Sequence, residues 1–132
     1  MLLSVKVAKT KGKINLAKPI LMLAIINEIE DGRILNNQIK YDASLIMTYK
    51  TLFYLYTKDS ITSPTYPYYY LGNDGFYHLK KDKSIRTPSA KFLREHVEYA
   101  YLDEDLWDLL QDAEVRQEYK EAIIKYFIKP KD

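Results

Sequence analysis

Residues 18–32 read KPILMLAIINEIEDG, a segment that is apolar for most of its length and ends in acidic residues and a glycine. Its apolar side chains recur near the spacing of about 3.6 residues that places them on one face of a helix. Proline suits the first position of a helix, where its missing N–H has no partner to lose, and glycine often follows the last turn. The segment therefore predicts a well-buried helix over residues 19–30, opened by Pro19 and closed by Asp31 and Gly32.

The length and composition of the chain are those of one folding domain. It has 132 residues, of which 47% are hydrophobic and 29% are charged, and it contains no cysteine. A chain of this size folds without a metal or disulfide, and the lack of cysteine excludes disulfides, thiolate zinc sites and cysteine nucleophiles. The longest apolar run, residues 20–26, is too short to span a bilayer, and the N-terminus lacks a secretory signal. We expect a single soluble, cytoplasmic domain over residues 1–132, with no membrane partner.

A second distinctive segment, residues 66–79, reads YPYYYLGNDGFYHL. Two aromatic runs that favour β-structure flank the turn-rich residues 72–75, a pattern typical of a hairpin. In such a strand Tyr66, Tyr68 and Tyr70 share one face and Tyr69 lies on the other. Proline has no N–H to donate, so Pro67 would lie at an edge or outside the sheet. The sequence therefore predicts an antiparallel hairpin here.

The other elements are mostly helical. Asp42, Ser89 and Asp103 are residue types that cap helices, and each precedes an apolar run; they predict helices from residue 43, over residues 90–96, and after Asp103. A last helix over residues 113–128 has an apolar stripe made of Val115, Tyr119, Ile123, Tyr126 and Phe127. Residues 1–15 fit a short helix or a strand, and residues 34–39 fit a short extended or hairpin segment. The fold class is α+β, a mostly helical single domain with a small antiparallel sheet.

Charge is distributed unevenly along the chain. Residues 1–27 hold five lysines and no acid, residues 78–94 hold six bases and one acid, and residues 95–118 hold nine acids and one arginine. If the two basic segments meet in the fold, they form a positive face that suits a polyanion. The alternative is an ordinary solvated surface, and charge alone does not separate the two.

Catalytic motifs are sparse. The histidines are His78 and His96, and the chain has no Gly-x-Ser-x-Gly elbow, no phosphate-binding glycine loop and no cluster of metal ligands. Glu118 and Lys120 match one fragment of a metal-dependent nuclease signature. They stand two apart in a predicted helix, however, where side chains point away from each other. We therefore predict no catalytic residues, metal or cofactor for this chain by itself.

Short blocks spread along the chain resemble a known family. The blocks are KPILMLAII at 18–26, GRI at 32–34, NQI at 37–39, YPY at 66–68, DGFYHL at 74–79, AYLDEDLW at 100–107 and YF at 126–127. In their order and spacing they resemble the sulfur-recognition domain of phosphorothioate-dependent type IV restriction endonucleases. The similarity covers roughly residues 14–128. In that family the domain usually precedes a C-terminal HNH nuclease domain, and we expect no nuclease domain within residues 1–132.

The resemblance implies a binding site for DNA in which sulfur replaces a non-bridging phosphate oxygen. Sulfur is larger and accepts hydrogen bonds more weakly than oxygen, so a selective pocket should be apolar, with cations around it to hold the DNA backbone. The family's pocket uses a Tyr-Pro pair, matched here by Tyr66 and Pro67, and a small residue whose position Tyr70 occupies. Where the family has a basic pair just before the proline of the first helix, this chain has Ala17 and Lys18.

Together, the resemblance and the charge pattern predict one DNA-binding set. The lysines at positions 9, 11 and 13 precede the first helix and belong to the same basic segment as Lys18. The predicted DNA- and sulfur-binding residues are Lys18, Pro19, Tyr66, Pro67, Tyr70, His78, Lys80, Lys81, Lys83 and Arg86.

Three functions follow as hypotheses. The first is a module of bacterial restriction or defence that binds double-stranded DNA, selectively when it carries phosphorothioate, with a separate nuclease subunit or a second copy as partner. The second is a family member that has lost DNA recognition and serves as a protein-interaction or assembly domain; Ala17, Tyr70 and the acidic residues 95–118 favour it. The third is a small nuclease that uses Asp74, His78 or the Glu118 and Lys120 pair.

Overall fold

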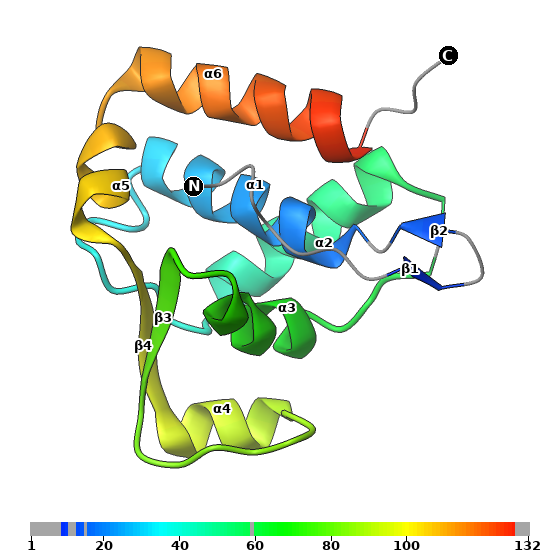
Figure 1. Ribbon diagram of the computed structural model, residues 1–132, viewed down its shortest axis with the longest axis vertical. Coiled ribbons are helices and arrows are strands. Elements are labelled where there is room, and N and C mark those ends of the chain that lie inside the picture. The colour runs from blue at the N-terminus through cyan, green and yellow to red at the C-terminus, as the bar shows by residue number, and fades with distance from the viewer. Residues whose placement is uncertain (1–8, 11–12, 15, 59, 129–132) are drawn as a thin grey trace.

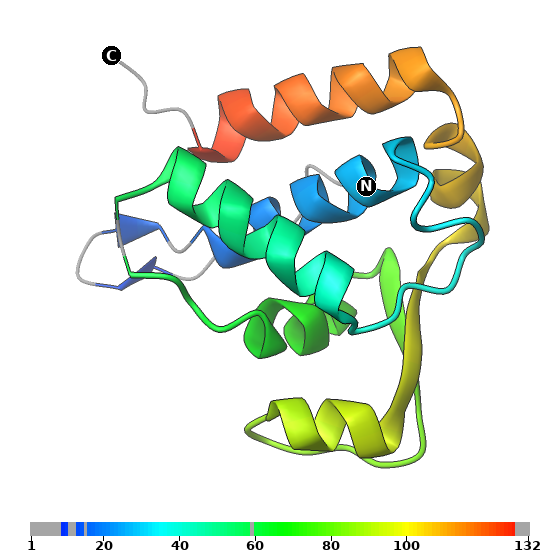
Figure 2. The ribbon, with the colours of Figure 1, turned by 180° about the vertical axis from the view of Figure 1, so that it is seen from behind.

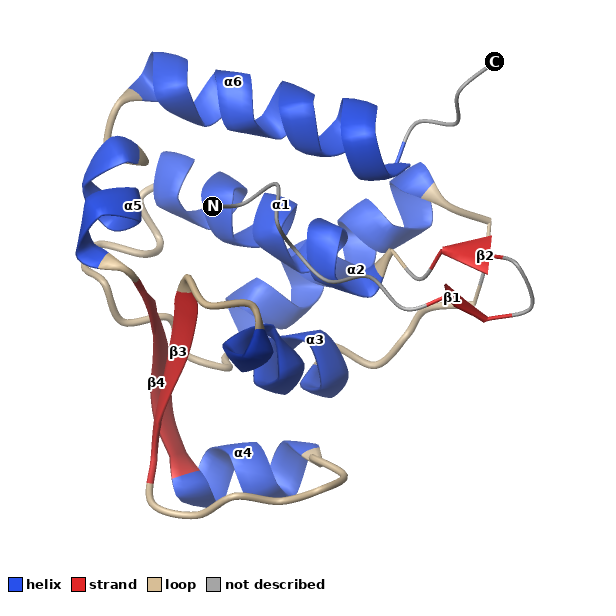
Figure 3. Cartoon of the chain, viewed as in Figure 1, coloured by secondary structure: helices blue, strands red, loops and turns tan. Residues whose placement is uncertain are grey.

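Helices make up most of the molecule. The computed structural model describes residues 9–10, 13–14, 16–58 and 60–128, and Figures 1 and 3 show its helices and strands. The central helix, α1 (Ala17–Glu30), lies between α6 (Ala113–Ile123) and α2 (Ala43–Tyr56), as the view from behind shows (Figure 2). A mostly helical chain with small antiparallel sheets is the α+β class that the sequence predicts, and this prediction is confirmed.

The central position of α1 follows from its apolar sequence. Every residue from Ile20 to Ile26 is buried, because helices pack against more than one face of α1. The helix starts at Ala17, so Pro19 is its third residue rather than its first, still within the turn whose N–H groups lack helical partners. Asp31 ends the helix and Gly32 follows with a φ of +75°, a conformation that glycine adopts without strain. The predicted helix and its end are confirmed.

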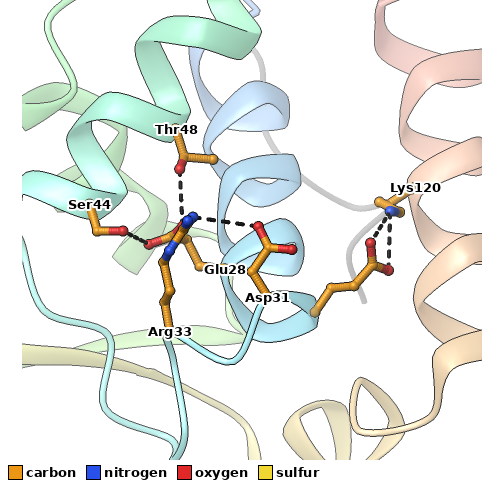
Figure 4. A network of polar contacts seen from close by, with 7 residues as sticks. Glu28, Asp31, Arg33, Ser44, Thr48 and Lys120 are labelled. Carbon is orange, nitrogen blue, oxygen red and sulfur yellow. Dashed lines mark hydrogen bonds and ion pairs between the residues drawn. The ribbon is translucent and has the colours of Figure 1, made fainter.

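A buried carboxylate joins α1 to α2. Glu28 accepts hydrogen bonds from Ser44 Oγ at 2.6 Å and Thr48 Oγ1 at 3.0 Å, both on α2 (Figure 4). Arg33 Nη1, in the loop after α1, lies 3.1 Å from the same carboxylate. A buried charge is tolerated only when it is paired and hydrogen-bonded, and Glu28 has both kinds of partner.

The predicted helix caps are mostly confirmed. The Asp42 carboxylate accepts the N–H of Leu45 at 3.0 Å at the start of α2, and Ser89 Oγ accepts the N–H of Phe92 at 3.1 Å at the start of α4 (Ala90–His96). Asp103 precedes α5 (Glu104–Leu109) but makes no capping hydrogen bond through its side chain. The predicted position of Asp103 before a helix is therefore confirmed, but the predicted capping by its side chain is not observed.

The last predicted helix has two parts. After α6 the chain continues as a π-helical turn, η3 (Ile124–Ile128). Ile123 is buried as predicted, whereas Tyr126, predicted on the same apolar stripe, is 58% exposed. A π-turn adds a residue per turn, which rotates the following side chains away from the α-helical stripe. Lys120 on α6 also forms an ion pair with Glu30 of α1, with 3.1 Å between Nζ and Oε2.

The predicted hairpin at residues 66–79 is wrong. Its first half is a helix, α3 (Thr65–Tyr70), followed by a short 3-10 turn, η2 (Leu71–Asn73). Pro64 and Pro67 lie at the N-terminal end of α3, where proline is tolerated. Tyr68 of α3 and Leu71, the first residue of η2, are both buried, and the Tyr68 hydroxyl donates to the carbonyl of Ile39 at 2.6 Å. Burial of these side chains outweighs the β-preference of the tyrosine run.

The main sheet instead pairs distant segments. The second half of the predicted hairpin is strand β3 (Tyr77–Lys81), which runs antiparallel to β4 (Val97–Leu102), a segment that the sequence did not mark as a strand. Tyr77 lies opposite Leu102 and Leu79 opposite Ala100 on one side of this ribbon. The ribbon extends from α5 to α4 (Figure 1). A second, very short antiparallel pair joins β1 (Lys9–Thr10) to β2 (Lys13–Ile14), so the strand alternative is correct for these four residues, and the rest of residues 1–15 lie outside the described part of the chain.

Residues 34–39 are extended only at their end. Ile39 pairs with Ala100 as an isolated antiparallel bridge, and the Asn37 side chain hydrogen-bonds the N–H and the carbonyl of Leu102.

In the part of the chain that the structure describes, no helix is both long enough and apolar enough to span a lipid bilayer.

Candidate nucleic-acid interface

Helix α3 presents two of the predicted aromatic residues together. Tyr66 and Tyr70 are four residues apart, so they lie on the same side of the helix. Their rings are parallel, with an angle of 1° between the planes and 6.5 Å between the ring centroids. Tyr66 is 40% exposed, whereas Pro67 and Tyr68 are buried. Of the three tyrosines expected on one strand face, two therefore remain neighbours and one belongs to the core.

Two tyrosines hold the basic loop that follows β3 against α3. The Tyr70 hydroxyl donates a hydrogen bond to the backbone carbonyl of Arg86. The Tyr69 hydroxyl oxygen accepts the N–H of Ile85 at 3.1 Å, and its ring packs edge-on against Tyr70. The backbone at Arg86 is thus fixed beside α3 while its side chain stays exposed.

Lys18 does not project freely into solvent. Its Nζ lies 3.3 Å from Oδ2 of Asp74, and only 18% of the Lys18 side chain is exposed. The Asp74 side chain is fully buried and follows η2, so this ion pair ties the first turn of α1 to the segment between α3 and β3. Pro19, the next predicted residue, is buried against the core. The positive charge of Lys18 is therefore balanced inside the protein.

The outer side of β3 carries a histidine and a lysine that also contact carboxylates. His78 Nε2 lies 2.5 Å from Oδ1 of Asp103, and Lys80 Nζ lies 3.3 Å from Oε2 of Glu98. The hydrogen bond and charge of Glu98 raise the pKa of Lys80 above its usual value. His78 and Lys80 lie opposite Tyr101 and Tyr99 in the ladder, and their side chains contact these rings. The acidic segment 95–118 thus supplies partners to the basic segment 78–94.

Three predicted cations remain available to an external anion. Lys81, Lys83 and Arg86 are exposed, and none forms an ion pair with a described residue. The side chains of the lysines at 9, 11 and 13 lie outside the described part of the chain. Helix α3 contacts both basic segments, because it packs against α1 and forms hydrogen bonds with the loop after β3.

The structure adds two cations that the sequence analysis did not single out. Tyr66 lines an open hollow of about 470 Å³ between α2, the start of α3 and the start of α4, and Lys50 and Arg94 line the same hollow. Arg94 belongs to the basic segment 78–94, so the charge count contained a signal for it. Lys50 lies in a segment with more acids than bases, and nothing in its local sequence distinguishes it.

The residues of the nuclease hypothesis do not form a centre. Asp74 is paired with Lys18, and His78 with Asp103. Lys120 is paired with Glu30 and belongs to α6, a helix that lies on the opposite side of α1 from α3 (Figure 1). Within the described ranges, no group of three or more histidine, aspartate or glutamate side chains could hold a metal ion.

Comparison with known proteins identifies the fold. No family model and no curated protein matches the chain. Among solved structures, the sulfur-binding domain of ScoMcrA complexed with phosphorothioated DNA superposes with a TM-score of 0.72, over 96% of this chain and 84% of that chain, at 18% identity. The sulfur-binding domain of SprMcrA, also complexed with phosphorothioated DNA, has a TM-score of 0.67, over 98% of this chain and 83% of that one, at 21% identity.

The same fold occurs within a larger enzyme. The type IV phosphorothioation-dependent restriction endonuclease ScoMcrA matches 93% of this chain with a TM-score of 0.68 and 18% identity, but the match spans only 28% of the endonuclease. The resemblance inferred from the sequence blocks is therefore confirmed at the level of the fold. Nearly the whole of this chain has the fold of the sulfur-binding domains of ScoMcrA and SprMcrA.

Proposed function

We propose that this chain is a DNA-binding module that recognises double-stranded DNA carrying a phosphorothioate, in bacterial restriction or defence. The observation that carries the proposal is the shared fold, because both sulfur-binding domains that superpose on nearly the whole chain are complexed with phosphorothioated DNA. Such a module would act in the cytoplasm, where bacterial DNA lies.

The sulfur would lie against α3. Tyr66 supplies a partly exposed aromatic ring, Pro67 an apolar neighbour, and Tyr70 a second ring parallel to the first. An apolar surface favours sulfur over oxygen, because sulfur loses less hydrogen bonding with water on burial. Tyr66, Pro67 and Tyr70 would together form an apolar cup for the sulfur. Tyr70 stands where the family resemblance implies a small residue, so it adds an aromatic wall to this cup.

The DNA backbone would be held by cations around the cup. Lys81, Lys83 and Arg86 have no ion-pair partner among the described residues and are the strongest candidates for phosphate contacts. Lys18, His78 and Lys80 belong to the proposed set as well, but each would share its charge with the carboxylate that it already contacts. Backbone contacts of this kind carry little sequence information.

We propose no catalytic role for the chain itself. It would form one recognition domain over residues 1–132, and strand cleavage would require a nuclease on another domain or subunit. This division is consistent with the ScoMcrA endonuclease, in which the matching fold accounts for 28% of the chain.

The test is a fluorescence-anisotropy titration with one short duplex, with and without a single Rp phosphorothioate, at low and at moderate salt. We expect tighter binding to the modified duplex, and binding to both should weaken steeply with salt because bound phosphates release counterions. Equal affinity for the two duplexes would contradict sulfur recognition. Absence of binding to either would contradict the DNA-binding role.

A role in protein assembly is the second candidate. The outward side of α2 exposes Met47 (65%), Tyr54 (83%) and Leu55 (67%), an apolar surface that no described element covers. Apolar residues grouped on a helix surface are typical of interaction sites. Light scattering over a range of protein concentrations tests self-assembly. If the protein is a monomer at every concentration, self-assembly is excluded and the partner at this surface would have to be a different protein.

A further inference from the structure

The hollow beside Tyr66 has a lining suited to an anion. It measures about 470 Å³ and lies between α2, α3 and α4, which follow one below another in Figure 2. Its polar lining combines two cations with the hydroxyl groups of five side chains. These residues are Lys50, Arg94, Tyr41, Ser63, Thr65, Tyr66 and Ser89.

The positive charges in this hollow have no carboxylate partner among the residues that the structure describes. None of its described lining residues carries a carboxylate. Neither Lys50 nor Arg94 forms an ion pair with any residue that the structure describes, in contrast to Lys18 and Lys80. Two uncompensated positive charges at one hollow repel each other, and a bound anion converts that repulsion into two attractions.

The field of Arg94 reaches into the hollow. Arg94 and Tyr41 both line this hollow; burial raises the pKa of the Tyr41 phenol, and the positive charge of Arg94 offsets part of that rise. Ser89 Oγ accepts the N–H of Phe92, which leaves the hydroxyl hydrogen free to donate to a ligand. Guanidinium, ammonium and hydroxyl donors together match the several acceptor oxygens of a phosphate.

We propose that this hollow binds a phosphate group of the nucleic-acid backbone, held between Lys50 and Arg94. The proposal rests on the proposed function and extends it, because Tyr66 borders both the hollow and the proposed sulfur cup. A strand whose modified phosphate contacts Tyr66 would place another of its phosphates in the hollow. The volume lies within the range of about 300–1,000 Å³ typical of ligand sites, which leaves room for the attached sugar.

The first test compares variants that remove one positive charge each. Lys50→Gln and Arg94→Gln should weaken binding of the modified and the unmodified duplex alike, each by roughly tenfold, because a charge-assisted contact is lost. Each should also lower the slope of log affinity against log salt by about one. The matched controls are Lys58→Gln, just after α2, and Lys91→Gln, on α4, because both are exposed lysines that do not line the hollow.

The controls decide the outcome. If Lys58→Gln and Lys91→Gln weaken binding as much as the lining variants do, the effect is one of net charge and the phosphate site is overturned. The circular dichroism spectrum and thermal midpoint of each variant should match those of the parent protein. Lys50→Met, which keeps the alkyl stem without the charge, should reproduce the Lys50→Gln result.

A second test separates the hollow from the proposed function. Inorganic phosphate is titrated into the ¹⁵N-labelled chain, and amide shifts at Thr65, Ser89 and Ala90 are followed. Saturating shifts at these amides that disappear in Arg94→Gln support a phosphate site in the hollow. If the chain nevertheless binds neither duplex, the proposed function fails, and the phosphate that the hollow binds would not come from nucleic acid. Absence of such shifts, together with unaltered DNA binding by Lys50→Gln, would overturn the site itself.

Discussion

Tyr66 is the residue whose environment most directly suits sulfur recognition. It is 40% exposed, its ring is parallel to that of Tyr70, and it borders the hollow that contains Lys50 and Arg94. An aromatic ring in this position offers apolar contact to sulfur and no charge to phosphate oxygen. Its effect on binding should therefore depend on whether the DNA is modified.

We expect Tyr66→Ala to reduce the preference for phosphorothioate DNA more than it reduces total binding. Loss of one well-placed apolar contact of this size should lower the affinity ratio between the two duplexes by about tenfold. Paired anisotropy titrations measure that ratio. Tyr54→Ala, which removes a tyrosine that is 83% exposed on α2, is the control and should leave the ratio unchanged. Equal losses on both duplexes would exclude Tyr66 from the sulfur contact.

Tyr70 combines a ring beside Tyr66 with a hydroxyl that binds the backbone at Arg86. Two variants separate these roles. Tyr70→Phe keeps the ring and loses a hydrogen bond whose net contribution is about 1 kcal/mol, so hydrogen exchange at residues 83–88 should become faster. Tyr70→Ala removes the second ring of the proposed apolar cup and should lower the preference for the modified duplex. An unchanged or higher preference in Tyr70→Ala would show that the ring is not part of the sulfur contact.

At the scale of the elements, Glu28 connects α1 to α2 through Ser44 and Thr48, and α1 to its following loop through Arg33. Glu28→Ala would leave two hydroxyl groups without their acceptor, and Arg33 would keep only its contact with Asp31. We expect a loss of about 2–4 kcal/mol in the free energy of unfolding, visible as a lower urea midpoint with an unchanged m-value. Glu95→Ala, at an exposed position on α4, should change it by less than about 0.5 kcal/mol. Matching midpoints for the two variants would contradict this role.

The elements also differ in how far local sequence defines them. Helix α1 has an apolar pattern and a glycine stop within its own residues, and α2 and α4 have capping side chains that hydrogen-bond within one turn. In α3 the local signals conflict, because a tyrosine run that favours strands follows a proline that suits a helix start. Contacts with Ile39, far away in sequence, bury Tyr68 and favour the helix.

For the molecule as a whole, the tyrosines of the core determine stability in alkali. Burial raises the pKa of Tyr49, Tyr68 and Tyr77 above the ordinary value of about 10. These side chains keep their protons in the folded state at a pH where the unfolded chain releases them. Their contribution is therefore complete below about pH 10 and is lost progressively as the pH rises above it.

We expect the free energy of unfolding, measured by urea titration from about pH 8 to about pH 11, to fall on the alkaline side. Tyr49→Phe removes one of the three buried phenols and its hydrogen bond to the carbonyl of Thr62, so its decline with pH should be shallower although its stability at pH 8 is lower. A decline as steep as that of the parent protein would show that Tyr49 does not contribute to the alkaline loss.

The features that could be predicted from the sequence are those that depend on short-range order. Hydrophobic periodicity and capping side chains gave the long helices, the end of α1 and the α+β class, and the spacing of short blocks indicated the fold that the solved sulfur-binding domains share. These features were predictable because their hydrogen bonds and apolar stripes lie within a few residues along the chain.

The folded structure set the features that depend on contacts between distant residues. It made the tyrosine run a helix, paired β3 with β4, set Lys18 against Asp74, and brought Lys50 and Arg94 to one hollow beside Tyr66. Local sequence does not encode these juxtapositions, because each results from side chains that find burial or an opposite charge only after the chain has folded.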